Sequence, residues 1–213
     1  PFFRNFFRWA SFAEAWRERR DDVARSAGQL VEAVRQSASL RPSLEPLTDD
    51  VLAGAARAAG AAFEPAFGGW GGAPKFPNAP ALEFLLRRGD DTSLAMVVKT
   101  LDGMAAGGMY DQLGGGFHRY SVDDRWLVPH FEKMLYDNAL LAPAYLHAWL
   151  VTGEDRYRAI AESTIEYLLR ELLLAEGGFA SAQDADTDGV EGLTFTWTEE
   201  EGVPAPARPG RPR

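Results

Sequence analysis

The stretch GGGFHRY at residues 114–120 is one of three stretches in which paired or tripled glycines run into an aromatic residue. The other two are AFGGWGG at residues 66–72 and EGGFASA at residues 176–182. The three aromatic residues are 47 and 62 positions apart, a spacing that accommodates two helices and a long loop. The sequence therefore predicts an array of helical hairpins, and glycine would let the connecting loops pack together at one end.

Composition limits the classes of protein to which the chain can belong. A chain of 213 residues that is 46% hydrophobic can bury a sizeable core. Its net charge of −9 repels phosphate backbones and anionic lipid, so we expect neither a nucleic-acid partner nor a membrane partner. The sequence has no cysteine, which excludes a disulfide or a thiolate nucleophile within it and suits a cytoplasmic protein.

Helical periodicity organises the chain into two parts. Apolar residues recur at helical spacing over residues 2–36, which predicts one or two helices there. The stretch 37–46 breaks this period with Pro42 and Pro46, so we place a domain boundary near residue 45. Beyond the boundary we expect five helices, the fourth with Pro129 at its first position, over residues 48–63, 79–88, 93–106, 129–151 and 154–175.

The predicted helix over 129–151 carries a polar stripe. At 100° per residue, His130, Lys133 and Asp137 fall within roughly 60° of one another. One interpretation is a solvated face with an ordinary Lys133–Asp137 ion pair. The other is a chemical site, because free backbone amides and the helix dipole favour anions at a helix N-terminus. Short strands are expected near 178–182 and 193–198.

Known catalytic and metal-binding motifs fit poorly. DADTDG at 184–189 resembles the opening of an EF-hand loop, but Phe195 stands where that loop needs its twelfth-position glutamate. We therefore interpret it as an acidic turn. The sequence contains no phosphate-binding Gly-Lys-Ser/Thr motif, no HExxH motif and no Gly-x-Ser-x-Gly motif. We predict no metal and no cofactor.

Three longer blocks carry a family resemblance: GGWGGAPKFPNAPALEFLLRRG (68–89), GGMYDQLGGGFHRYSVDDRWLVPHFEKMLYDNALL (107–141) and EGGFASAQDADTDGVEG (176–192). They resemble signature blocks of the spermatogenesis-associated protein 20 family, whose members have a thioredoxin-like domain followed by a six-hairpin (α/α) toroid. That toroid is similar to N-acylglucosamine 2-epimerases and six-hairpin glycosidases. The resemblance implies an all-α fold, a partial (α/α)6 toroid of about two and a half hairpins, preceded by the helical end of a thioredoxin-like domain.

The resemblance also implies a domain organisation. Residues 1–40 would be the C-terminal helical remnant of the thioredoxin-like domain, and residues 45–201 the partial toroid. Residues 202–213 would form a disordered Pro/Arg-rich tail. Because the chain begins at Pro1 and the match stops near Glu201, we expect a fragment. Its structural partners would be the remainder of the toroid and of the thioredoxin-like domain.

In toroids of this kind the pocket lies where glycine loops meet the N-termini of inner helices, which implies a set of site residues. Candidate catalytic residues are His130, His118, Asp137 and Glu132. Candidate substrate-binding residues are Trp70, Lys75, Arg119, Tyr120, Asp123, Trp126, Asp184 and Asp186. Histidine would act as acid or base, aromatic rings would stack on sugar faces, and Arg119 and Lys75 would hold an anionic group.

Two functions stay open for the parent protein. Its toroid would bind or process carbohydrate, as a hydrolase or an isomerase. Alternatively, it would be a non-catalytic binding or scaffold module that partners the thioredoxin-like domain, and the chain itself would be inactive. Fold resemblance alone cannot choose between these functions.

Overall fold

The computed structural model describes residues 12–38, 46 and 48–197, and the chain divides into two compact units, Pro1–Thr48 and Asp49–Arg213. The first unit contains a helix over residues 12–18 and then α2 (Arg20–Ala38). Both agree with the predicted helical period, whose first residues, 2–11, lie outside the described part, as do the tail 202–213 and most of the linker. That this unit derives from a thioredoxin-like domain stays a prediction.

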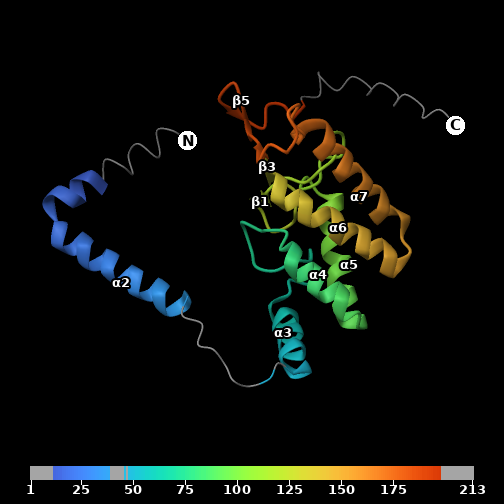
Figure 1. Cartoon of the computed structure of the whole chain (residues 1–213), viewed down its shortest axis with the longest axis horizontal. Helices are drawn as coiled ribbons and strands as arrows, with labels where there is room; N and C mark the ends of the chain where they lie inside the picture. The colour runs from blue at the N-terminus through green and yellow to red at the C-terminus, as the bar shows by residue number, and fades with distance from the viewer. Residues whose placement is uncertain (1–11, 39–45, 47, 198–213) are drawn as a thin grey trace. The chain divides into compact units, whose positions relative to one another are not determined.

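The second unit is built from antiparallel helical hairpins (Figure 1). A single helix, α3 (Asp49–Ala62), is followed by the hairpin of α4 (Ala79–Arg88) and α5 (Asp91–Ala106). The next hairpin joins α6 (Leu135–Thr152) to α7 (Asp155–Tyr167), which continues as one π-helical segment, η1 (Leu168–Leu172). The predicted order of helices is therefore confirmed, and it corresponds to about two and a half hairpins.

Local sequence explains the tight connections within the two hairpins. Gly89 and Gly153 end α4 and α6 with φ of 69° and 74°, the left-handed conformation that glycine adopts without a Cβ penalty. Asp90 then caps α5, because its carboxylate accepts the Ser93 N–H at 3.0 Å. Each hairpin is thus closed by a connection of two residues.

The core lies between the two hairpins. Leu82 and Leu85 of α4 and Leu101 of α5 are fully buried, and they share one cluster with Leu141 and Tyr145 of α6. The Tyr145 hydroxyl donates to the Leu101 carbonyl at 2.8 Å, so this large side chain is buried with its polar atom paired. Within the described residues, no helix is long and apolar enough to cross a membrane.

All three glycine loops close in the same way. Isolated antiparallel bridges join Phe63 to Trp70, Tyr110 to Phe117 and Leu173 to Phe179, so each predicted aromatic residue pairs back onto the end of the preceding helix. In each loop a backbone N–H after the helix donates to a glycine carbonyl: Glu64 to Gly69, Asp111 to Gly116 and Leu174 to Gly178. The repeat seen in the sequence is therefore a repeat of backbone structure.

The glycines of the first two loops are required because neighbouring atoms approach them closely. A Cβ on Gly68 would lie 2.8 Å from the Thr100 backbone of α5, and a Cβ on Gly115 would lie 2.6 Å from Ser163 Oγ of α7. Both glycines have positive φ. In the third loop, Gly177 and Gly178 also have positive φ but nothing lies within 4 Å of the added Cβ. The first two loops are thus packed against the next hairpin.

Buried lysines join successive repeats at this end. The Lys75 ammonium donates to Glu64 Oε2 at 3.1 Å and to the Asp124 carbonyl at 2.9 Å. Lys133 repeats the arrangement, with Asp111 Oδ2 at 2.7 Å and the Gly115 carbonyl at 2.9 Å. Their side chains are 0% and 1% exposed. Each lysine therefore ties a glycine loop to the segment that follows it.

The prediction of a helix from Pro129 to Val151 is wrong at its start. Residues 129–130 form β2 (Pro129–His130), which pairs with β1 (Tyr120–Ser121), and α6 begins only at Leu135. The two residues before α6 form β3 (Lys133–Met134), which pairs with β4 (Ala182–Gln183). Proline lacks an N–H donor, and this property suits the start of an edge strand as well as the start of a helix.

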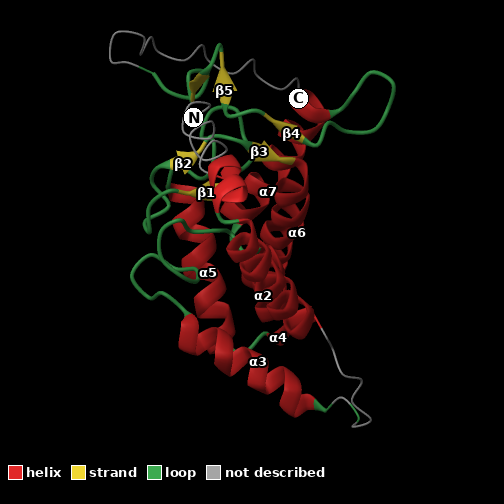
Figure 2. Cartoon of the chain, turned by 90° about the vertical axis from the view of Figure 1, so that its left-hand side faces the viewer, coloured by secondary structure: helices red, strands yellow, loops and turns green. Residues whose placement is uncertain are grey.

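The acidic stretch forms a hairpin. β5 (Asp186–Thr187) pairs with β6 (Val190–Glu191) across Asp188 and Gly189, which have φ of 53° and 78°. An Asp-Gly pair with positive φ at both positions is the preferred two-residue turn of a β-hairpin. The acidic turn is confirmed, whereas the strand predicted near 193–198 is not found in the described residues 193–197. Figure 2 shows the short strands together at one end of the helices.

Candidate functional site

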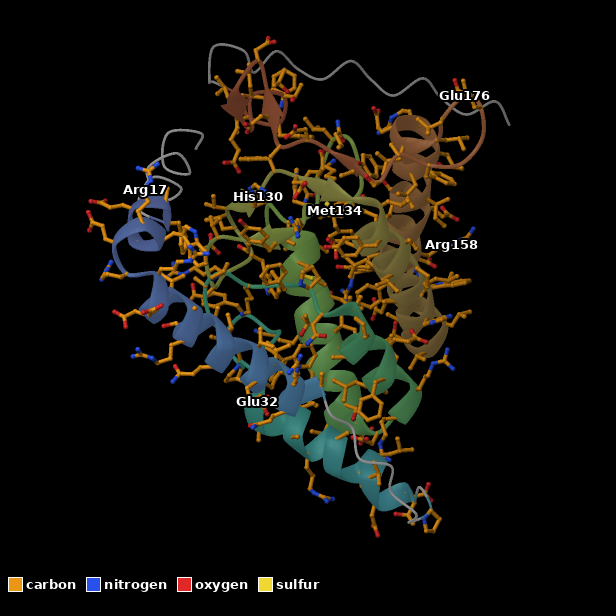
Figure 3. The ribbon with its side chains drawn as sticks, turned by 60° about the vertical axis from the view of Figure 1, so that its left-hand side comes forward. Arg17, Glu32, His130, Met134, Arg158 and Glu176 are labelled. Carbon is orange, nitrogen blue, oxygen red and sulfur yellow. The ribbon has the colours of Figure 1, made fainter. Side chains whose placement is uncertain are left out.

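Paired strands bring three rings together at the strand-bearing end. Because β1 and β2 pair in register with Tyr120 opposite His130, these two rings stack at 4.9 Å with planes 23° apart. On its other side Tyr120 meets Phe76 at 4.9 Å, and Phe76 is 50% exposed. We call Phe76, Tyr120 and His130 the ring stack. His130 is labelled in Figure 3, where it lies at the same end of the second unit as Met134.

Charged groups surround the ring stack. Arg119 Nη1 donates to Glu132 Oε2 at 2.8 Å, and the same carboxylate lies 3.7 Å from His130 Nε2. The other ring nitrogen of His130, Nδ1, lies 2.6 Å from Glu191 Oε1. His130 therefore lies between two carboxylates, with 26% of its side chain exposed. We refer to Arg119, His130, Glu132, Asp137 and Glu191 as the polar cluster.

Two atoms of the polar cluster are buried without a partner. Among the described residues, Arg119 Nε and Asp137 Oδ2 are the buried side-chain nitrogen and oxygen atoms that lack any hydrogen bond. A buried donor or acceptor without a partner costs roughly 1–3 kcal/mol, so each such atom calls for an explanation, and a ligand is one. Burial raises the pKa of Asp137 to about 6, with Arg119 and the Tyr136 hydroxyl opposing the shift and Glu132 adding to it. The Asp137 carboxyl thus holds its proton at mildly acidic pH, well above the usual range of an aspartate.

Chemically, the polar cluster combines an acid with a base. Asp137 is a carboxyl group whose proton is available near pH 6, and Glu132 is a carboxylate held by a guanidinium. Two acidic side chains in different environments are how proteins separate general-acid and general-base roles. The ring stack beside them offers apolar faces, so the arrangement suits a ligand with both a flat apolar face and exchangeable protons.

Three predicted substrate-binding residues have structural contacts inside the fold. Lys75 is fully buried in its ion pair with Glu64, so it is not available to an anionic ligand. Trp126 is 0% exposed, and its indole N–H donates to the Phe67 carbonyl at 3.0 Å. Trp70 closes the first glycine loop, where its indole N–H donates to the Ala59 carbonyl at 2.9 Å. Burial leaves Lys75 and Trp126 without a surface for a ligand, whereas the predicted binding role of Trp70, which is only partly buried, stays a prediction.

The predicted aspartates outside helix α6 shape turns. Asp123 accepts backbone N–H groups from Arg125, Leu127 and Val128, and these bonds hold the pKa of its carboxyl below the usual value although burial opposes them. Asp184 accepts the Asp186 N–H at 3.0 Å. Asp186 pairs with Glu191 in the β5–β6 hairpin, so it lies next to a residue of the polar cluster.

His118 lies apart from the polar cluster. Its side chain lines a cavity of about 770 Å³ that none of the polar-cluster residues lines. It is 2% exposed, and its Nδ1 lies 2.9 Å from the Phe131 carbonyl oxygen. The structure therefore separates His118 from His130, Glu132 and Asp137, with which the sequence grouped it. Within the described residues no group of three or more histidine or acidic side chains is arranged to hold a metal ion.

The structure also adds residues that the sequence analysis did not select. Phe76 follows the buried Lys75 directly, and the alternation of side chains in an extended segment would have placed it on the opposite, exposed face. Glu191 reaches His130 from 61 positions away in the chain, and no local pattern indicated that contact. The predicted Lys133–Asp137 ion pair is replaced by Lys133–Asp111.

Solved structures identify the class of fold. The second unit is similar to a sugar epimerase from a ruminal bacterium, with a TM-score of 0.55 and 17% identity over 61% of this chain and 37% of that one. Cellobiose 2-epimerase from Spirochaeta thermophila gives a TM-score of 0.54 and 20% identity over 67% and 41% of the two chains. The all-α fold of a partial (α/α)6 toroid is thus confirmed.

No family model matches the chain, but it is similar in sequence to several known proteins. Human spermatogenesis-associated protein 20 is 43% identical over 153 residues, covering 65% of this chain and 20% of the human protein. An uncharacterized protein of Caenorhabditis elegans is 38% identical over 157 residues, covering 65% and 21%. The chain is therefore a relative of the spermatogenesis-associated protein 20 family, as its signature blocks predicted. It spans about a fifth of the length of these relatives.

Proposed function

We propose that the polar cluster and the ring stack bind a carbohydrate and process it by acid–base chemistry, as a hydrolase or an isomerase. The proposal rests on one observation. Two buried polar atoms without a hydrogen bond, Arg119 Nε and Asp137 Oδ2, lie in the cluster beside an exposed aromatic face. A sugar offers hydroxyl groups to the polar atoms and an apolar C–H face to the rings. The fold also supports carbohydrate processing, because the similar solved structures are described as sugar and cellobiose epimerases.

Each residue has a role in this proposal. Arg119 keeps one guanidinium nitrogen on Glu132 and offers Nε to a ligand oxygen. Asp137 is the general acid, because burial raises its pKa to about 6 and so keeps its proton in place at mildly acidic pH. Glu132 is the general base, since its carboxylate is held between Arg119 and His130. Phe76, which is 50% exposed at the outer end of the ring stack, offers the aromatic face on which the sugar ring lies, and Tyr120 and His130 support it.

The two reaction types use these groups differently. In hydrolysis, Asp137 gives its proton to the glycosidic oxygen as the C–O bond breaks, and Glu132 takes a proton from the water that attacks the anomeric carbon. In isomerisation, Glu132 removes the proton from the carbon next to the sugar carbonyl while Asp137 protonates the carbonyl oxygen, giving an enediol. The enediol is then reprotonated to give the isomer.

Two assays on the same samples distinguish these reactions. Nitrophenyl glycosides report hydrolysis by release of nitrophenol. Proton NMR of glucose, mannose and cellobiose in D₂O reports loss of the C–H signal next to the carbonyl. We expect turnover in one assay, reduced by about 10²-fold or more in Asp137→Asn and in Glu132→Gln.

A matched control is available on the same helices. Glu83 of α4 accepts from Arg87 and pairs with His147 of α6 at 2.8 Å, a carboxylate–histidine pair about 15 Å along α6 from Asp137. Glu83→Gln should retain turnover. Saturable sugar binding without turnover in either assay would favour the alternative of a non-catalytic binding module. Absence of both binding and turnover would refute the proposal.

A further inference from the structure

The cavity that His118 lines is a second concave site on the same unit. It has a volume of about 770 Å³, within the range of small-molecule sites. Its walls are rich in aromatic side chains, namely Tyr110, Phe131, Tyr167, Phe195 and Trp197. Phe131 and Phe195 stack with parallel planes at 5.9 Å. Two neighbouring residues belong to different sites: His118 lines the cavity, whereas Arg119 belongs to the polar cluster.

The charges in the cavity wall are paired with one another. Lys133 is bound to Asp111 at 2.7 Å, and Arg170 Nε is bound to Glu171 at 2.7 Å. Arg170 also donates to the Gly114 carbonyl at 2.6 Å. Burial, with the positive charge of Lys133, lowers the pKa of His118 to about 4, so its ring is neutral at pH 7. The lining therefore presents no uncompensated charge, and a charged ligand would find no counter-ion there.

His118 offers one specific polar atom. Its Nδ1 lies 2.9 Å from the Phe131 carbonyl, which can only accept, so Nδ1 must carry the proton. In a neutral imidazole the other nitrogen, Nε2, then has a lone pair. The ring is 2% exposed, and no described residue provides a donor to Nε2. Since Nε2 is not one of the fully buried unpaired atoms, it is open to a hydrogen-bond donor from an occupant of the cavity.

Gln183 supplies the complementary group. Its Oε1 accepts from the Tyr167 hydroxyl at 3.0 Å, and this bond orients the amide. The amide NH₂ has no acceptor among the residues that the structure describes, and Gln183 also lines the cavity. The wall thus combines one acceptor, one donor and flat apolar surfaces.

We propose that this cavity is a second ligand site, separate from the polar cluster, for a neutral ring-shaped molecule that bears hydroxyl groups. One hydroxyl donates to His118 Nε2, and an oxygen accepts from the Gln183 amide. The apolar face of the ring packs against Phe195 and Trp197. The site does not require the polar cluster to be catalytic.

The test uses the whole chain and three neutral probes: glucose, cellobiose and myo-inositol. Saturable binding of at least one probe is expected by calorimetry or saturation-transfer NMR. Glucose 6-phosphate and glucuronate serve as charged counterparts and should bind more weakly. Equal or tighter binding of the charged probes would contradict a site for neutral ligands, as would absence of binding by all three neutral probes.

Two substitutions of His118 distinguish the roles of its two ring nitrogens in ligand binding. In His118→Asn the amide NH₂ can still donate to the Phe131 carbonyl, but the acceptor in the cavity is lost, so affinity should fall by about tenfold. In His118→Gln the longer side chain again places a polar group near the Nε2 position and should recover part of the affinity. Trp197→Leu provides a second variant whose folding is not at stake, because Trp197 is 65% exposed. It too should weaken binding.

The two proposals fail in different ways. Glu132→Gln should leave probe binding in this cavity unchanged, and His118→Asn should leave any turnover at the polar cluster unchanged. Binding that is lost in Glu132→Gln but kept in His118→Asn and Trp197→Leu would place the probe in the polar cluster and overturn the second site.

Discussion

The ammonium of Lys133 lies 2.7 Å from Asp111 Oδ2, across 22 positions of sequence, with the lysine side chain 1% exposed. Burial lowers the pKa of Lys133 although Asp111 opposes the shift. Burial is the largest influence on the pKa of Asp111 and raises it, but the Lys133 charge and the hydrogen bonds from Lys133, Gly114 and Leu113 together bring this pKa below its usual value. The pair joins the second glycine loop to the strand that precedes α6. It is a repeat of the Lys75–Glu64 pair at the first loop.

Breaking this pair should destabilise the second unit. Lys133→Met leaves the Asp111 charge partly buried and unpaired, and removal of one partner from a buried pair costs about 3–5 kcal/mol. Urea unfolding measures the loss. Glu162→Gln is the control, because it breaks the exposed Arg158–Glu162 pair and should cost less than about 1 kcal/mol. A similar loss in both variants would show that burial is not what makes the Lys133 pair important.

Alanine substitution of two equivalent glycines distinguishes the cost of a packing clash from the cost of backbone strain. Gly116 and Gly178 have φ of 77° and 80°, so alanine is strained at either position, by roughly 1 kcal/mol. A Cβ on Gly116 also collides with the Tyr167 ring, whereas a Cβ on Gly178 has nothing within 4 Å. Gly116→Ala should therefore cost about 1–3 kcal/mol more than Gly178→Ala in urea unfolding. Equal costs would mean that φ alone makes glycine necessary.

Stability should depend on pH through Asp137. Its pKa in the folded chain is raised to about 6 from 3.8, so the stability that the protonated group contributes is complete below pH 3.8 and is lost as the pH rises through 6. The asparagine of the Asp137→Asn variant cannot ionise, so this residue causes no loss of stability as the pH rises. Thermal melts of both proteins should agree near pH 4, and the variant should be the more stable one at pH 7. A constant difference across this range would argue against a raised pKa.

The ring stack should contribute to affinity rather than to proton transfer. Tyr120→Leu removes the central ring of the stack, so Phe76 and His130 lose the ring that holds them in place, which should weaken sugar binding by about tenfold. In a turnover assay KM should rise while kcat changes little. Phe179→Leu is the matched control, since Phe179 is an exposed aromatic residue of the third glycine loop. Equal effects of the two substitutions would remove the special role of Tyr120.

Local signals in the sequence predicted most of the helices. The helix predicted over residues 79–88 has the same bounds as α4, because Pro80 near its start and Gly89 at its end act within one turn of the chain. Likewise, the repeated glycines marked three loops that share one backbone pattern. These features depend on neighbours in sequence, so one sequence is enough to recognise them.

Contacts between distant segments were not predictable in this way. The helical spacing of His130, Lys133 and Asp137 was misleading, because pairing of β2 with β1 and of β3 with β4 outweighs local periodicity. Lys75 and Trp126 were chosen for their chemistry, but their partners Glu64 and Phe67 bury them. The structure does bring five of the predicted site residues together, although they lie on β1, on β2, in the loops beside these strands and on α6. They are Arg119, Tyr120, His130, Glu132 and Asp137.

The account rests on recognition of a sugar by the polar cluster and the ring stack, and NMR titration tests this most directly. Glucose, mannose and cellobiose would be added to the chain labelled with ¹³C in its histidine, tyrosine and aspartate side chains. We predict saturable shifts of the His130 and Tyr120 ring signals and of the Asp137 carboxyl signal, with the His147 ring unchanged. Shifts confined to His118, or none at all with any of the three sugars, would contradict the account.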